Sequence, residues 1–135
     1  MTYIDYRCII YLDILCIEVS NMKFEKSLVS GSTALLVLSL LSDGDKYGYE
    51  MVLELARRSD NAFELKEGTL YPLLHALEKA GEVRAYERTA PSGRERRYYA
   101  LTERGKGRLA EKTEEWVRFS AGVNAVLRAA AAPGV

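Results

Sequence analysis

The chain has few of the residues that build disulfide-rich, metal-binding or catalytic sites. Its 135 residues include two cysteines, Cys8 and Cys16, and a single histidine, His75. Two cysteines without further ligands at metal-binding spacing predict neither a disulfide framework nor a metal site. The sequence also lacks a glycine-rich phosphate loop and a His-Glu-x-x-His motif. We therefore expect no catalytic residues, no metal and no cofactor.

A long uninterrupted hydrophobic run is also missing. Residues 1–21 are rich in apolar and aromatic side chains, but Asp5, Asp13 and Glu18 divide them. A membrane-spanning helix needs about 20 mostly apolar residues, and a secretory signal needs a basic start and an unbroken apolar core. We therefore expect a cytoplasmic protein without a membrane partner. Because Met22 precedes a polar helix start, we interpret residues 1–21 as an N-terminal extension that arises from a misplaced start codon.

The chain has no net charge, so only the local distribution of charge is informative. Basic and acidic side chains number 19 each. Residues 84–108 hold eight basic and three acidic side chains, whereas residues 1–68 hold seven and eleven. A local basic cluster of this kind is typical of a nucleic-acid contact, and a solvated charged surface is the alternative.

Apolar periodicity predicts three helices in one domain, which a chain of this length can bury around a single core. In the third helix, Leu70, Leu73, Leu74 and Leu77 fall at i, i+3, i+4 and i+7 and therefore share a core-facing side. That helix should end at Gly81, because glycine readily takes the left-handed conformation found after helices. We expect the helices at residues 27–42, 47–58 and 67–80.

A β-hairpin should follow the third helix. Residues 83–88 and 96–101 are rich in strand-favouring side chains, and they flank a turn at Pro91-Ser92-Gly93. Three helices followed by such a hairpin predict a mainly α (α+β) fold, a winged helix-turn-helix with a two-stranded β wing. The winged-helix DNA-binding domain would occupy residues 22–105.

The last helix should begin after Thr102 and carry a narrow apolar stripe. Leucine, tryptophan and valine recur at seven-residue spacing, and two further apolar residues lie between them. A stripe of this width predicts packing on a partner helix. We therefore expect a long C-terminal dimerisation helix at residues 106–130, followed by a frayed tail at 131–135. The interface residues would be Leu109, Trp116, Phe119, Val123 and Val126.

Side chains that point away from the leucine face are the candidate DNA contacts. Hydroxyl and imidazole groups on the third helix can meet phosphates or base edges, and arginines near the hairpin tip can meet the backbone. Proline should be tolerated near the first turn of the helix, where its missing amide would be unpaired. The candidate residues are Thr69, Tyr71, Pro72, His75, Arg88, Arg94 and Arg96.

Two of these candidates, and the nearby Arg97, have structural alternatives to a DNA contact. The ring of Tyr71 could pack against the edge of the domain instead of contacting DNA. A lone helical histidine such as His75 is more often a surface or packing residue than a contact. Arg97 shares a strand face with Tyr99 and Leu101, so an internal salt bridge is as reasonable for it as a DNA contact.

Four blocks of sequence, in order and at the right spacing, resemble the PadR family of bacterial winged-helix transcriptional regulators. The first is the leucine-rich helix near the start of the domain. The others are Asp-Lys-Tyr-Gly-Tyr-Glu at 45–50, Gly-Thr-Leu-Tyr-Pro-Leu-Leu-His-Ala-Leu-Glu at 68–78, and Gly-Arg-Glu-Arg-Arg-Tyr-Tyr-Ala-Leu-Thr-Glu-Arg-Gly at 93–105. The chain is similar to the short branch of the family, which has one C-terminal helix. Glu82 departs from the family pattern, because an apolar residue is usual there.

The resemblance implies a homodimer that places two recognition helices on a palindromic operator in double-stranded DNA. It also implies a repressor that a small aromatic or phenolic effector can release. In the family's short branch, a tryptophan on the last helix lines a pore between the subunits, and Trp116 occupies that position here. Two hypotheses remain for Trp116, which could stack on an effector or anchor the subunit interface.

A winged helix that binds another protein instead of DNA is the alternative function, because a fold alone does not fix what it binds. The basic surplus of residues 84–108 favours DNA.

Overall fold

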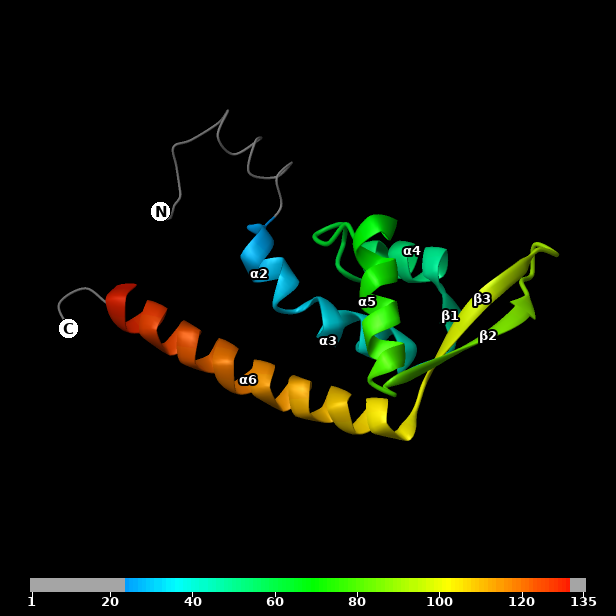
Figure 1. The fold of residues 1–135 in the computed structure, drawn as a ribbon. Coiled ribbons are helices and arrows are strands. Elements are labelled where there is room, and N and C mark those ends of the chain that lie inside the picture. The colour runs from blue at the N-terminus through cyan, green and yellow to red at the C-terminus, as the bar shows by residue number, and fades with distance from the viewer. Residues whose placement is uncertain (1–23, 132–135) are drawn as a thin grey trace, which may run out of the picture.

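The computed structural model describes residues 24–131 of the chain (Figure 1). The predicted extension at residues 1–21 and the tail beyond residue 131 lie outside this range. The elements are α2 (Lys26–Ser30), α3 (Thr33–Leu41), β1 (Lys46–Tyr47), α4 (Gly48–Arg58), α5 (Glu67–Lys79), β2 (Val83–Thr89), β3 (Glu95–Leu101) and α6 (Glu103–Ala131). This order of helices, hairpin and long last helix is the predicted winged helix-turn-helix.

The first predicted helix is in fact two helices, α2 and α3, separated at Gly31 and Ser32. The hydroxyls of Ser32 and Thr33 donate to the carbonyl of Val29 at 3.1 and 2.7 Å. Serine and threonine side chains that bond nearby carbonyls offer the backbone an alternative to helix continuation. The expectation of one continuous helix over residues 27–42 was therefore wrong at this turn.

The hairpin lies in a three-stranded antiparallel sheet of order β1-β3-β2. The register of β2 and β3 pairs Val83 with Leu101 at the base and Thr89 with Glu95 near the tip. β1 adds a short third strand, with Tyr47 opposite Tyr98. The two-stranded wing is confirmed, and the strand that pairs with the middle of β3 was not predicted, because two residues carry no periodicity.

The core lies between α3, α4, α5 and the base of the hairpin. Leu70 and Leu74 of α5 are fully buried, Leu77 is buried, and Leu73 is partly buried against the same cluster. The predicted inward face of this helix is therefore confirmed. Other members of the core are Val37, Leu38, Leu40, Leu41, Met51, Leu55, Leu65, Val83 and Tyr99.

The C-terminal end of α5 and the start of α6 form the expected caps. Gly81 has a φ of 79°, and the amide of Glu82 donates to the carbonyl of Leu77 at 2.9 Å, as in a Schellman cap. The Thr102 hydroxyl accepts the Gly105 amide at 3.0 Å, so Thr102 caps α6 as predicted.

α6 packs on α3 near its start and extends beyond the body of the domain, on the side away from the hairpin tip (Figure 1). Its 29 residues correspond to about 44 Å of helix. Within residues 24–131, none of the helices is both long and apolar enough to cross a bilayer.

Candidate nucleic-acid interface

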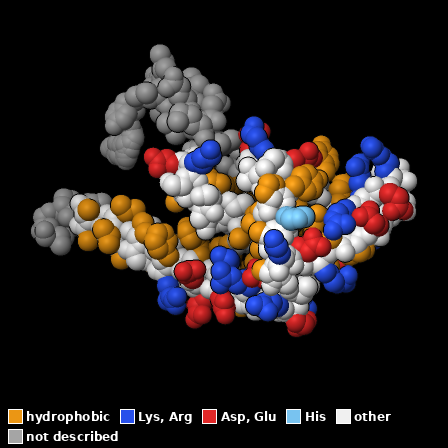
Figure 2. All heavy atoms as spheres, in the orientation of Figure 1, with side chains coloured by type: hydrophobic (Ala, Val, Ile, Leu, Met, Phe, Trp, Pro, Cys, Tyr) orange, Lys and Arg blue, Asp and Glu red, His pale blue; other side chains and the backbone are white. Residues whose placement is uncertain are grey.

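The outer face of α5 carries the four candidate residues of that helix. Thr69, Tyr71, Pro72 and His75 are all exposed, because the leucines on the opposite face occupy the core. A shallow hollow of about 550 Å³ lies on this face, and its lining includes Lys79. The histidine of α5 and the basic side chains near the hairpin tip are visible from the same side of the molecule in Figure 2. The face therefore offers hydroxyl, imidazole and ammonium groups to one ligand.

Pro72 lies deeper in α5 than expected. The helix begins at Glu67, so Pro72 is its sixth residue and its missing amide would have bonded to the carbonyl of Gly68. The expectation that this amide would be unpaired in any case was therefore wrong. Gly68 is exposed, so water can reach its carbonyl.

Tyr71 contacts the first residue of α4. A β-carbon built on Gly48 would lie 2.5 Å from the Tyr71 hydroxyl oxygen and 2.8 Å from Cζ. The same ring lines a second pocket of about 300 Å³ with Tyr47, Arg96 and other residues. Burial raises the pKa of Tyr71, and the nearby Glu67 carboxylate raises it further. Tyr71 thus packs on the domain, as the structural alternative expected, and still keeps 44% of its surface exposed, so its contact with DNA stays a prediction.

The hairpin tip presents Arg94 to solvent. The amide of Gly93 donates to the carbonyl of Ala90, and the amide of Ala90 donates to the carbonyl of Arg94, both at 2.8 Å. Gly93 has a φ of 92°, a conformation that other residues rarely adopt, so glycine is needed at this turn. Because Arg94 follows this tight turn and is exposed, its guanidinium can reach a ligand beyond the tip.

Arg88 and Arg96 lie farther down the hairpin and contact tyrosine rings. The Arg88 guanidinium lies 4.8 Å from the centre of the Tyr98 ring, and that of Arg96 lies 5.2 Å from the centre of Tyr47. Arg88 is exposed. Arg96 is half-buried, and its Nε has no hydrogen-bond acceptor within the described residues. Arg88 is thus available to a ligand, and Arg96 also packs against Tyr47 of β1.

A ladder of alternating arginine and tyrosine on one face of the hairpin was missed by the sequence analysis. Arg84 lies 5.3 Å above the ring of Tyr86, which stacks on Tyr98 at 5.9 Å. Tyr86 donates a hydrogen bond to Asp45 at 2.6 Å, which raises the pKa of Tyr86. Arginine and tyrosine occupy alternate positions along β2, which indicates that they share one face of the strand. Which residue of β3 lies opposite them depends on the register of the two strands.

Arg97 is used inside the protomer. Its guanidinium is 3.5 Å from the carboxylate of Glu78 on α5 and 3.3 Å from that of Glu87 on β2. The salt-bridge alternative is therefore confirmed for Arg97. Arg108 lies 3.8 Å from Glu82, which explains how a carboxylate is accommodated where an apolar residue was expected. The basic surplus of this region is thus partly neutralised, and Arg88 and Arg94 remain the most accessible cations among the predicted contacts.

α6 exposes an apolar stripe that begins at Trp116. Phe119 is 60% exposed and Val126 is 69% exposed, values that are high for large apolar side chains. Figure 2 shows hydrophobic side chains along the C-terminal half of this helix. Leu109, by contrast, packs partly buried against the core of its own protomer. The candidate dimer stripe therefore consists of Trp116, Phe119, Val123 and Val126, with Leu109 at its intramolecular end.

Trp116 also lines a pocket between α6 and the α2–α3 turn. The pocket has a volume of about 300 Å³, and Trp116 and Phe119 form one wall, with their ring centres 6.1 Å apart. Lys112 and Glu115 add a charge of each sign, and Leu28 and Leu35 contribute from the opposite side. The lining of this pocket therefore combines aromatic and aliphatic side chains with one charge of each sign. Within residues 24–131, no cluster of three or more histidine, cysteine or carboxylate side chains could hold a metal.

Comparisons of the sequence and of the structure with known proteins point to the same family. The model of the transcriptional regulator PadR-like family matches residues 37–111, which include α4, α5 and the hairpin. The transcriptional regulator Rv3488 of Mycobacterium tuberculosis is 35% identical over 75 residues, which cover 56% of this chain and 66% of that protein.

Solved structures agree with the family match. A PadR family regulator from Eggerthella lenta is 32% identical with a TM-score of 0.67, and the match covers 84% of this chain and 96% of that one. A PadR-like regulator from Bacillus cereus is 27% identical with a TM-score of 0.68, covering 76% and 97% of the two chains.

Proposed function

Because the chain belongs to the PadR-like family of transcriptional regulators, we propose that it binds double-stranded DNA as a homodimer and represses transcription from a palindromic operator. The observation that carries the proposal is the exposed face of α5 beside an arginine-bearing hairpin tip. In a winged helix, the helix reads the major groove and the hairpin contacts the neighbouring backbone. α5 is accordingly the recognition helix, and the loop at residues 90–94 is the wing tip.

The residues divide between positioning and readout. Arg94 at the tip and Arg88 on β2 are exposed cations, which suit contacts to phosphates. His75 on the recognition helix is exposed with its imidazole, and Tyr71 beside it exposes part of its side chain, which suits contacts to base edges. Thr69 and Pro72 border the same face, and Arg96 supports the wing from a half-buried position. Arg97 contributes stability and not affinity, because Glu78 and Glu87 already pair with it.

The partner for the apolar stripe of α6 is a second copy of this chain. Exposed apolar side chains at helical spacing over residues 116–126 of α6 form a surface that needs a partner of similar shape. Two-fold pairing makes such a surface complementary to itself. A two-fold dimer would carry two recognition helices and read two half-sites about 34 Å apart, which explains why the operator should be palindromic.

Trp116 would couple the dimer to an effector. The pocket beside its ring has apolar residues on two sides and lies against α2 and α3. The recognition helix comes later in the chain than these two helices. A small aromatic or phenolic compound that stacks on Trp116 would change the packing of α6 and, through it, the spacing of the two recognition helices. Release of DNA is the expected consequence.

The experiment that tests the proposal is selection of genomic DNA fragments by the purified full-length protein. We expect the retained fragments to share an inverted repeat, with two protomers bound per site and repression of a reporter placed downstream. The alternative function, a protein-interaction module, would be supported if the retained fragments shared no sequence and the affinity for DNA did not fall as salt rises.

A further inference from the structure

Gly48 has ordinary helical backbone geometry, so backbone freedom does not explain why glycine is present there. It is the first residue of α4 and is not among the described residues with a positive φ. Alanine is favoured over glycine in helices by about 1 kcal/mol. The explanation therefore has to come from the space around the missing side chain.

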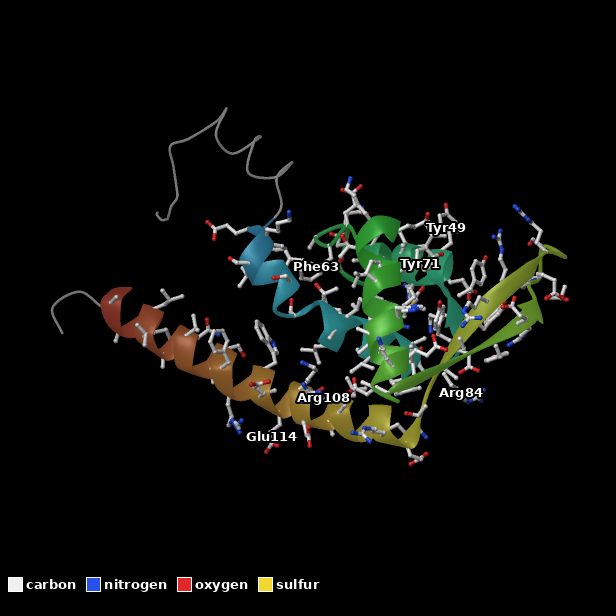
Figure 3. All side chains as sticks on the ribbon, viewed as in Figure 1. Tyr49, Phe63, Tyr71, Arg84, Arg108 and Glu114 are labelled. Atoms are coloured by element: carbon white, nitrogen blue, oxygen red, sulfur yellow. The ribbon has the colours of Figure 1, made fainter. Side chains whose placement is uncertain are left out.

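That space is filled by the recognition helix. A β-carbon at position 48 would come within 2.5 Å of the Tyr71 hydroxyl oxygen, 2.8 Å of Cζ and 3.0 Å of Cε1. Gly68 and Gly107, by contrast, also lie in helices, and a β-carbon there would meet open space. Tyr71 and Gly48 are 23 positions apart in the chain, so this contact fixes the side chain of one helix against the backbone of another. Figure 3 shows Tyr71 beside α4, on the side of the domain away from α6.

The Tyr71 side chain lines two hollows. One is the hollow on the outer face of α5, which Pro72 and His75 also line. The other is the smaller pocket lined by Arg96, to which Tyr47 and Tyr99 also contribute. Burial raises the pKa of Tyr71, which agrees with a ring seated against the protein. If a methyl group filled the space at Gly48, the Tyr71 ring would have to move, and its movement would change the shape of the exposed face of α5.

We infer that Gly48 is a positioning residue for DNA recognition: the absence of a side chain there seats Tyr71 against α4 and sets the shape of the surface that the recognition helix presents. The inference rests on the proposed function, since it requires that Tyr71 faces DNA. Gly48 itself makes no contact with DNA in this account and acts through the orientation of the Tyr71 ring. The partner read by this surface is the base-pair edge of a duplex.

The test is a double-mutant cycle in full-length protein with Gly48→Ala, Tyr71→Ala and the combination of both. The probes are a labelled duplex that carries the inverted repeat recovered by fragment selection and a scrambled duplex of the same composition. We expect Gly48→Ala to weaken binding to the repeat about tenfold and to leave binding to scrambled DNA unchanged. In the Tyr71→Ala background the same substitution should have no further effect, because the obstructing ring is gone.

Gly107→Ala is the matched control, since it makes the same change in a helix where the new methyl group meets open space. Equal melting temperatures of Gly48→Ala and the native protein would show that altered binding does not come from unfolding. If Gly48→Ala does unfold the protein, the comparison moves to the Tyr71→Ala background. A loss of stability there as well would overturn the inference, because the ring would not be its cause.

Two further outcomes separate this inference from the proposed function. If Tyr71→Ala lowers preference for the repeat and Gly48→Ala does not, the positioning role is wrong and the DNA interface stands. If Tyr71→Ala leaves the preference intact, the placement of the recognition surface is wrong, and the role of Gly48 is wrong with it. The inference would also be overturned if Gly48→Ala weakened binding to the repeat equally in the native and the Tyr71→Ala backgrounds.

Discussion

Gly105 in the first turn of α6 packs directly against the backbone carbonyl of Glu82, so closely that a β-carbon at position 105 would overlap the carbonyl oxygen. The amide of Thr102 donates to the same oxygen at 3.1 Å. This contact holds the start of α6 against the segment that follows α5. It therefore connects the long last helix to the helix that carries the candidate DNA contacts.

Gly105→Ala should destabilise the domain. The obstructing atom belongs to the backbone and is already hydrogen-bonded, so it cannot move aside as a flexible side chain could. Overpacking of this kind lowers the free energy of unfolding by about 1 to 3 kcal/mol. Urea denaturation measures the change, and Gly107→Ala, whose methyl group meets open space, should be neutral or slightly stabilising. Equal stability of both variants would contradict the packing described here.

Arg94→Ala should weaken binding to every DNA sequence by a similar factor. Its guanidinium follows the tight turn of the wing tip, where it would meet a phosphate. Loss of one phosphate contact should lower the slope of log K against log salt by about one. Arg118→Ala is the control, because Arg118 is an exposed cation on α6 away from the wing. An unchanged slope in Arg94→Ala would remove the wing tip from the interface.

Tyr71→Ala should act differently, by reducing the preference for operator over scrambled DNA. The substitution removes a side chain from the exposed face of α5 that we propose enters the major groove, and contacts to base edges are worth about 1 to 3 kcal/mol of discrimination. Competition binding with the two duplexes measures the ratio. A uniform loss on both duplexes would reassign Tyr71 from readout to positioning of the protein on the backbone.

Trp116→Ala should raise the dissociation constant of the dimer about tenfold or more, since buried aromatic anchors dominate interface energies. Sedimentation at a series of concentrations measures the constant. Val117→Ala is the matched control, because Val117 is the adjacent exposed residue and lies off the stripe. A dimer that responds equally to both substitutions would place the interface elsewhere.

The effector hypothesis has a separate test at the same residue. Trp116 is the single tryptophan, so its fluorescence reports directly on a molecule that stacks on it. Planar phenolic compounds should quench the emission and lower DNA affinity over the same concentration range. If they quench without changing DNA affinity, Trp116 is an interface anchor and the pocket has no regulatory role.

Glu54 should give the stability of the domain an acid dependence. Hydrogen bonds from Arg57 and Arg58 lower the pKa of Glu54 from 4.5 to about 2. A carboxylate whose folded pKa is depressed stabilises the fold above its unfolded pKa and loses that contribution as pH falls through the folded value. Glu54→Gln should therefore be less stable than the native protein at neutral pH, and the difference should shrink between pH 4.5 and about 2.

Chemical denaturation across this pH range measures the effect of Glu54→Gln. Glu64→Gln serves as the control, because Glu64 is exposed and the described residues offer it no ion-pair partner. A stability difference for Glu54→Gln that stays constant from pH 7 to pH 2 would contradict the assignment.

Local patterns in the sequence predicted the elements, whereas contacts between distant residues had to come from the structure. The spacing of Leu70 and Leu74 is a local property of one helix, so its buried face was predictable. The seat of Tyr71 on Gly48 depends on how two helices cross, and nothing in either local sequence specifies that distance. The helix start at Glu67 was predicted correctly, but Pro72 is the sixth residue of the helix and so lies beyond the first four positions, whose amides lack a partner.

Among the candidate site residues, charge alone could not separate arginines that pair inside the domain from those left free. Arg94 and Arg97 are close in sequence and equally basic. The strand register places Arg97 opposite Glu87 and within reach of Glu78, while Arg94 lies in the turn between β2 and β3. Register is set by the whole hairpin, so the distinction required the fold.

The most direct test of the central claim is fluorescence anisotropy of the purified protein with the promoter region upstream of its own gene, against scrambled DNA, across a salt series. The account predicts preferential binding of two protomers per site, with affinity that falls steeply as salt rises. Equal affinity for both DNAs at every salt concentration, and for every fragment recovered by genomic selection, would contradict the proposal that this winged helix reads an operator.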